Sequence, residues 1–274
     1  MNNRTDLAVE EIGRTADVTG ISQQHRRAGT ATVTRITVHT ESAARRLQKP
    51  VGQYVTIAVP RFSDHADDEN RLAPVIAQEL RRLIPHGRAL VAGLGNASIT
   101  PDAVGPQTAA HVIATRHLRG EFARAAGLDR LRPVSVVTPG VMGCTGIDTT
   151  EFLRGIVRES TPDFLIAIDA LAAASAARLG NTVQLCDTGI SPGSGVHNAR
   201  PKLSRDTLGI PVIAIGLPTV IDGRVLQGTD DCPLIVTPRE IDLLLHRAAH
   251  TIGVAINLAL QPMLGLPEII QLMA

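Results

Sequence analysis

Aromatic residues are scarce in this sequence of 274 residues, which has no Trp, one Tyr and four Phe. A hydrophobic core must therefore be built from Val, Ile, Leu and Ala, and these residues suit strands that are buried on both faces of a sheet. Apolar residues make up 44% of the chain and charged residues 19%. This balance is typical of a folded globular protein and excludes disorder over most of the length.

Three further features are missing. An excess of positive charge is absent, with 27 basic against 26 acidic residues, so the sequence argues against direct nucleic-acid binding. The three cysteines, Cys144, Cys186 and Cys232, are odd in number and lack paired spacing, which indicates reduced thiols in a cytoplasmic protein. There is no run of 18 apolar residues and no signal-peptide pattern, so we expect no membrane association.

The first 30 residues are polar and show no helical or strand periodicity, which predicts a mobile N-terminal arm. We expect residues 31–274 to form a single α/β domain. Residues 32–38 and 54–59 have the composition of strands, and residues 67–84 have the pattern of an amphipathic helix.

From residue 89 onward, short apolar runs alternate with helical segments. Each run ends in a cluster of Gly, Pro or Asp; the runs span 89–92, 133–137, 164–168, 182–186 and 211–215. We expect helices to begin near Asp102 and Asp148 and to span 170–178 and 238–260. Strands that alternate with helices predict a mostly parallel sheet flanked by helices.

Open α/β sheets bind ligands beyond the carboxyl ends of their strands, and aspartates gather in the loops expected there. Asp169 follows a buried strand, where a carboxylate suits proton transfer but could equally cap the next helix. Asp102 follows a glycine-rich loop and taken alone fits the first turn of a helix. If their strands are neighbours, the two carboxylates meet in one crevice and can share a proton.

Other loops at this edge carry candidate substrate-binding residues. Gly95 and Asn96 lie in a loop that lacks the third glycine of a dinucleotide-binding motif, so we expect its backbone to approach a substrate or an anion. Ser194 lies in a Pro-Gly-Ser-Gly run that suits either an anion-binding nest or a tight turn. Gly140 and Asp187, in the loops after the runs 133–137 and 182–186, are the other candidate substrate-binding residues. The histidines lack metal-ligand spacing, and we expect neither a metal nor a cofactor.

Several runs together resemble the germination protease (spore protease) family. They include Arg4-Thr5-Asp6-Leu7-Ala8-Val9-Glu10, Gly93-Leu94-Gly95-Asn96, Thr100-Pro101-Asp102-Ala103, Thr115-Arg116-His117-Leu118, Pro139-Gly140-Val141-Met142-Gly143, Ile168-Asp169-Ala170-Leu171, Asp187-Thr188-Gly189-Ile190 and Pro192-Gly193-Ser194-Gly195. They occur in order from residue 4 to about residue 222.

The resemblance implies an atypical aspartic-type endopeptidase of spore-forming bacteria, with a fold similar to that of hydrogenase maturation proteases. It implies that Asp102 and Asp169 are the catalytic pair and that small acid-soluble spore proteins, degraded during germination, are the substrate. It also implies a homotetrameric zymogen in the spore interior that removes its own N-terminal segment, here between Asp6 and Leu7. Ala174 stands where this family commonly has Arg.

Two alternatives use the same residues differently. In one, Asp102 and Asp169 bind a metal ion that activates water, although the sequence names no convincing third ligand. In the other, the chain binds small basic spore proteins without cleaving them, and the carboxylates form an acidic recognition patch.

Overall fold

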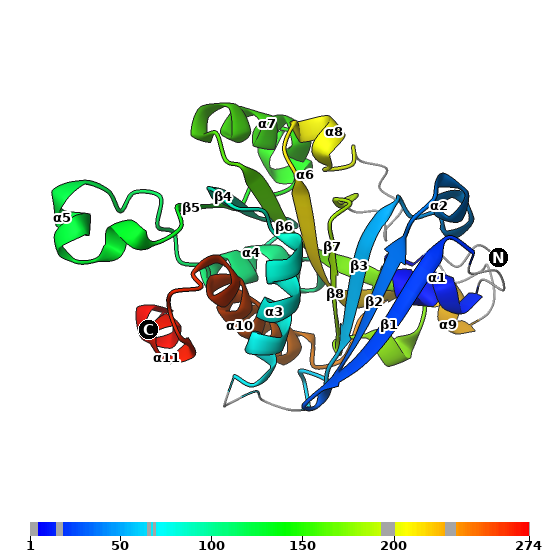
Figure 1. Cartoon of the computed structure of the whole chain (residues 1–274). Coiled ribbons are helices and arrows are strands. Elements are labelled where there is room, and N and C mark those ends of the chain that lie inside the picture. Colours follow the sequence, from blue (N-terminus) through cyan, green and yellow to red (C-terminus); the bar gives the residue numbers. More distant parts are fainter. Residues whose placement is uncertain are drawn as a thin grey trace.

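A computed structural model of the chain describes residues 5–14, 19–64, 67, 70–192, 201–227 and 234–273. One twisted sheet has the strand order β1-β2-β3-β7-β8-β6-β4-β5, with β9 paired to β8, and helices cover both of its faces (Figure 1). The strands are β1 (Ile21–Ala28), β2 (Ala31–Val38), β3 (Gly52–Ala58), β4 (Ala89–Gly93), β5 (Val134–Val137), β6 (Phe164–Ala173), β7 (Thr182–Cys186), β8 (Val212–Asp222) and β9 (Ile235–Val236).

The longer helices belong to the layers that cover the sheet, and the shorter ones connect strands. The α-helices are α1 (Ala8–Arg14), α2 (Glu41–Leu47), α3 (Leu72–Leu83), α4 (Val104–Ala110), α5 (Gly120–Ala125), α6 (Met142–Thr145), α7 (Thr149–Ser160), α8 (Arg205–Leu208), α9 (Gly223–Gln227), α10 (Ile241–Leu260) and α11 (Leu266–Met273). Three 3-10 helices are η1 (Thr100–Asp102), η2 (Leu128–Arg130) and η3 (Ala176–Arg178).

The α/β class predicted from the sequence is confirmed, and the parallel part of the sheet is confined to four strands. Strands β5, β4, β6 and β8 pair in parallel. Strands β1, β2, β3 and β7 pair antiparallel, and β7 is also antiparallel to β8. Four of the five runs that were read as strand–helix alternation are therefore wound in parallel, and the fifth, 182–186, is not.

Two apolar layers enclose the sheet, one on each face. One layer combines strand residues with α3, α4, α10 and α11, and the other combines them with α1, α2, α7 and α8. Neighbouring residues of β6 point into opposite layers: Leu165 belongs to one and Ile166 to the other, and both are fully buried. This two-sided burial explains why the parallel strands read as continuous apolar runs.

Strand β6 is longer than the sequence predicts, and the helix expected over residues 170–178 is wrong. The strand continues to Ala173, and its parallel pairing with β8 reaches Ala173 and Ile221. Only the short η3 (Ala176–Arg178) is helical in that stretch. Alanine favours helices by a fraction of a kcal/mol per residue, and pairing with a buried neighbouring strand overrides this preference.

The mobile arm expected over residues 1–30 is also wrong for the residues that the structure describes. Leu7 is fully buried, α1 packs against α2, β2 and β3, and β1 pairs with β2 along its whole length. β1 is an edge strand whose side chains are mostly exposed, so it needs backbone pairing but no apolar alternation. For this reason its sequence carries no strand signal.

Helix α10 is the single described helix that is long and apolar enough to cross a membrane by length and composition. In the structure 78% of its most apolar window is buried inside the fold. It packs against α3 and α4, so α10 is a central helix of the core.

Candidate active site

Asp169 lies within β6 at the point where the strand loses a neighbour. β4 pairs with β6 only as far as Gly93 and Ile168, whereas β8 continues alongside on the other side. The Asp169 side chain shares a face with Leu165, Ala167 and Leu171 by strand alternation, and the residue is only 4% exposed. Its Oδ1 accepts a hydrogen bond of 2.9 Å from the backbone N–H of Ala170. The carboxylate is thus a buried group beside an open strand edge.

Asp102 lies in the loop that follows β4, and this loop is bonded to β6 at Ile168 and to β8 at Thr219. Its Oδ2 accepts a hydrogen bond of 2.7 Å from the Asn96 backbone N–H. The loop is tied to β8 by the Thr219 hydroxyl, which donates to the Pro101 carbonyl over 2.7 Å. Asp102 ends η1, and α4 follows at Val104, so the prediction of a helix starting near Asp102 is correct to within two residues.

The loop that carries Asp102 is hydrogen-bonded to β6 beside Asp169. Leu94, just beyond β4, donates from its N–H to the Ile168 carbonyl over 2.8 Å, so the Asp102 loop joins β6 one residue before Asp169. Ala103 and Val104 belong to one apolar layer, whereas the face of Asp169 belongs to the other. Carboxylates held in this way suit general acid–base chemistry on a group bound at the edge.

Gly95 allows this close approach. Its φ is +108°, a conformation that disfavours any other residue, and an added Cβ would lie 2.0 Å from the Asp102 carbonyl oxygen. We expect Gly95→Ala to displace the Asp102 loop and to lower the melting temperature by about 5 °C or more, the sum of backbone strain and a steric clash. Differential scanning calorimetry measures the shift.

Gly120→Ala is the matched control for that substitution. Gly120 also has a positive φ, +83°, but nothing lies within 4 Å of an added Cβ. It reports the backbone strain alone. Equal shifts for the two variants would show that the contact between Gly95 and Asp102 is unimportant.

The remaining residues predicted to bind substrate do not all join this edge. Gly140 has a φ of +73° in the loop after β5, and Ser194 lies outside the described residues. The placement of Asp187 at the same edge is wrong: β7 is antiparallel to β8, so Asp187 leaves the sheet at the opposite edge. There its carboxylate accepts hydrogen bonds from the N–H and the side-chain amide of Gln53, at 2.8 and 3.2 Å.

The N-terminal segment occupies the open edge of β6, which the sequence did not predict. The Asp6 N–H donates to the Ala172 carbonyl over 3.1 Å, and the Ala172 N–H donates to Asp6 Oδ2 over 2.9 Å. Lys49 Nζ donates to the Thr5 and Asp6 carbonyls, both at 3.1 Å. The N-terminal segment is therefore fastened to β6 through Asp6, three residues beyond Asp169. Lys49 carried no sequence signal, because its partners are more than 40 residues away.

Two of the described histidines form a ring contact and not a metal site. Among the residues that the structure describes, no group of three His, Cys, Asp or Glu side chains is placed to hold a metal ion. His111 and His250 pack edge to face with ring centroids 5.3 Å apart. Burial, and then the neighbouring His250 and His246, lower the pKa of His111. These rings belong to the contact between α4 and α10.

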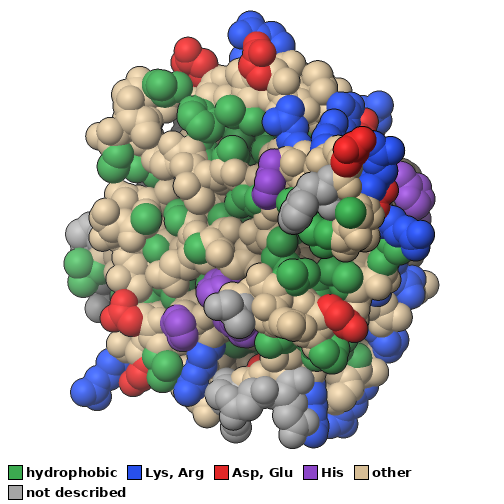
Figure 2. All heavy atoms as spheres, turned by 90° about the vertical axis from the view of Figure 1, so that its left-hand side faces the viewer, with side chains coloured by type: hydrophobic (Ala, Val, Ile, Leu, Met, Phe, Trp, Pro, Cys, Tyr) green, Lys and Arg blue, Asp and Glu red, His purple; other side chains and the backbone are tan. Residues whose placement is uncertain are grey.

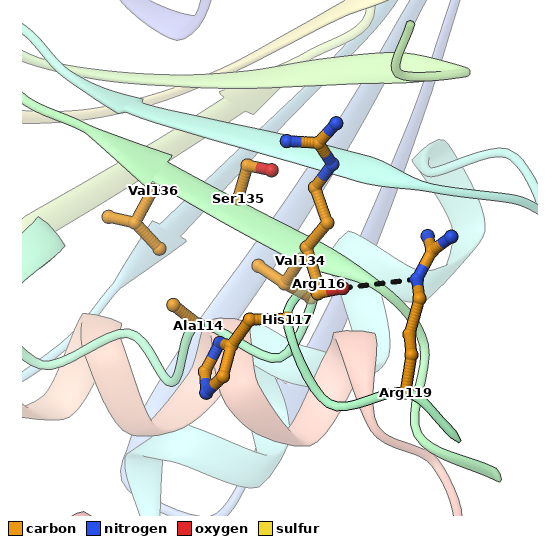
Figure 3. Close-up of a pocket in the computed structure, with 7 residues that line it drawn as sticks. All are labelled: Ala114, Arg116, His117, Arg119, Val134, Ser135 and Val136. Carbon is orange, nitrogen blue, oxygen red and sulfur yellow. Dashed lines mark hydrogen bonds between the residues drawn. The ribbon is translucent and has the colours of Figure 1, made fainter. Parts of the chain in front are cut away.

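A pocket of about 470 Å³ lies elsewhere, beside the edge strand β5 (Figure 3). Arg116 and Arg119 point the same way along it, and the Arg119 Nε–H donates to the Arg116 carbonyl over 3.1 Å. Thr115 anchors this segment, because its hydroxyl accepts from the Val134 N–H over 3.0 Å. On the molecular face shown in Figure 2, basic side chains gather along one margin and hydrophobic ones are scattered between polar groups. None of the predicted site residues lines the pocket.

The fold and the site together define an α/β protein that presents two carboxylates at the open edge of a buried parallel strand. The sequence profile described as germination protease matches residues 2–232. A germination protease from Caldanaerobacter subterraneus subsp. tengcongensis is 38% identical over 98% of both chains, and one from Clostridium acetobutylicum is 34% identical over 97% of both. The chain belongs to the germination protease family, as the motifs predict.

Among solved structures, a [NiFe] hydrogenase maturation protease, HycI from Thermococcus kodakarensis, is similar at a TM-score of 0.38 and 17% identity. The match covers 65% of this chain and 98% of that one.

Proposed function

We propose that the chain is an endopeptidase that degrades small acid-soluble spore proteins during germination, with Asp102 and Asp169 activating a water molecule. The proposal is supported by the hydrogen bond that joins the loop carrying Asp102 to β6 one residue before Asp169, at an edge of β6 where the N-terminal segment is already bound. Membership of the germination protease family supports a peptidase acting in germination.

The mechanism follows from the open edge. An extended substrate pairs with the backbone of β6 beyond Asp169, as Asp6 pairs with Ala172. One carboxylate, ionised, takes a proton from water as the oxygen attacks the peptide carbonyl. The other, protonated, gives its proton to the departing amide nitrogen. Gly95 and Asn96 lie beside Asp102, and we expect the backbone at these two residues and at Gly140 to contact the substrate.

The same proposal includes a zymogen that is processed between Asp6 and Leu7, assembly as a homotetramer, and action in the spore interior. The contact between Asp6 and Ala172 supports the first part, because it covers the strand edge that a substrate needs. Removing the segment that ends at Asp6 uncovers the edge.

The experiment incubates the purified full chain with a purified small acid-soluble spore protein and follows the products by mass spectrometry. We expect a few defined fragments, and N-terminal sequencing is expected to show that a fraction of the chain now begins at Leu7. Binding without fragments would contradict the proposal and favour a non-catalytic spore-protein binder. Activity that is lost with EDTA and restored by a divalent cation would replace it with a metal-dependent peptidase.

A further inference from the structure

Glu10 is a carboxylate with one satisfied oxygen and one that is not. Its Oε2 accepts a hydrogen bond of 2.8 Å from the Ala174 backbone N–H and another from the Thr5 hydroxyl. Its Oε1 is buried and has no hydrogen-bond partner among the described residues. A buried acceptor without a partner costs stability, so this half of the carboxylate is open to a donor that the described residues do not supply.

The Thr5 hydroxyl stands between Glu10 and the backbone nitrogen of Leu7. The Leu7 N–H donates to Thr5 Oγ1 over 3.0 Å, and Thr5 Oγ1 donates in turn to Glu10. Leu7 directly precedes α1, and Glu10 is the third residue of that helix. A Glu at this position commonly reaches back to the backbone nitrogen that precedes the helix. Thr5 intercepts this contact.

We propose that Glu10 forms the binding site for the α-ammonium group that is created at Leu7 when the Asp6–Leu7 bond is cleaved. This inference rests on the proposed processing. Hydrolysis consumes one water molecule, leaves a carboxylate on Asp6 and gives Leu7 a protonated amine. The departing segment takes the Thr5 hydroxyl with it. The new amine has three N–H donors in place of one, enough to reach both Glu10 oxygens.

Neighbouring groups favour this exchange of partners. The Leu7 side chain is fully buried, so the new N-terminus stays fixed near Glu10 after cleavage. Lys49 Nζ donates to the carbonyls of Thr5 and Asp6, so both of these hydrogen bonds are lost with the departing segment and do not hold Leu7 in place. An ammonium group adds the attraction of its own positive charge to the hydrogen bond, whereas the Thr5 hydroxyl that it replaces carries no charge.

Cleavage releases Ala172 of β6 from the N-terminal segment but leaves Ala174 bound to Glu10. Loss of Asp6 frees the N–H and carbonyl of Ala172, three residues beyond Asp169, for a substrate. Glu10 keeps its hydrogen bond to Ala174 and so holds the end of the strand in place. Glu10 is thus a positioning residue for the processed enzyme. It touches no reacting atom.

The test compares melting temperatures and needs no peptidase activity, so its failure is distinguishable from failure of the proposed function. Chain 7–274 is released from a fusion partner by a protease that leaves no extra residue, once with Leu7 first and once with one Gly before Leu7. We expect the free Leu7 chain to melt about 3 °C or more above the Gly-extended chain, because only its amine reaches Glu10.

Glu10→Gln is expected to bring this difference to within about 1 °C, because the amide keeps the size of the side chain but removes the charge. Glu11→Gln, on the same turn of α1, is the control and should leave the difference intact. A difference that persists in Glu10→Gln, or none in the parent pair, overturns the proposal. So does a free Leu7 chain that fails to fold while the full chain folds.

Discussion

Replacing Asp169 by Asn is expected to slow cleavage of a small spore protein by at least about a hundredfold, the scale of a lost general acid or base. The amide keeps an oxygen that can accept the Ala170 N–H, so the local structure has no reason to change. The substitution removes the negative charge and the ability to exchange a proton. Initial rates under substrate excess, with circular dichroism to verify the fold, measure the effect.

Asp102→Asn should have an effect of the same size for the same reason, since the Asn oxygen can still accept the Asn96 N–H. If the two carboxylates act as one unit, the double variant should be little slower than either single variant, because each substitution already disables the pair. Additive losses in the double variant would mean that the two residues act independently.

Asp163→Asn is the matched control for both substitutions. Asp163 directly precedes β6, the strand that carries Asp169, but lies at its other end and pairs with Arg88 over 3.2 Å. Its cleavage rate should remain within about threefold of the parent rate, because it lies away from the edge where protons are exchanged. Normal turnover by a folded Asp169→Asn protein would remove the proposed mechanism.

The strands that carry the site could be predicted from the sequence, because their signal is local. The apolar runs before Gly93 and Asp169 correspond to β4 and β6, and these strands are neighbours. Parallel neighbours end at one edge of a sheet. The two runs therefore predict that the loop after β4 lies beside the end of the β4–β6 pairing, where Leu94 bonds the Ile168 carbonyl; that Asp102 and Asp169 act together stays a prediction.

The direction of β7 could not be predicted, and this explains the error at Asp187. The run 182–186 has the same apolar composition as the parallel strands, and a helix was expected before it. In the structure the chain instead passes from β6 through the short η3 and returns antiparallel to β8. Strand direction depends on that connection, and its Ala-rich residues carried a helical signal.

The N-terminal contacts were beyond prediction for a different reason. Asp6 binds Ala172, and Glu10 binds Ala174, so each contact joins residues that are more than 160 positions apart. The N-terminal partners are polar residues in a polar stretch, which looks the same in a sequence whether it is bound or free. Only the packing of Leu7 into the core distinguishes the two cases, and a lone Leu has no periodicity.

Glu79 of α3 is expected to contribute more to stability than any other single ion pair among the described residues. Its side chain is fully buried and binds Arg35 through two hydrogen bonds of 2.6 and 2.7 Å and Arg26 through one of 3.0 Å. These contacts fasten α3 to β1 and β2. We expect Glu79→Gln to destabilise the protein by about 3 kcal/mol at pH 7, because it leaves the arginines without their counter-charge.

The dependence of this loss on pH distinguishes the charge from the packing. Burial raises the pKa of Glu79, but the hydrogen bonds and charges of Arg35, Arg26 and Arg82 outweigh it, and the net pKa lies below the ordinary value of 4.5. A lowered pKa in the folded state means that the stabilisation is complete above about pH 5 and is lost as the pH falls further. The difference between parent and variant should therefore shrink below about pH 4.

Urea denaturation at pH 7 and at about pH 3.5 measures both free energies of unfolding. Glu159→Gln is the control: Glu159 pairs with Arg158 over 3.1 Å, but both side chains are at least 75% exposed, so solvent screens the pair and no measurable loss is expected. A Glu79→Gln deficit that is equally large at both pH values would show that side-chain packing, rather than the buried charge, holds α3 against the first two strands.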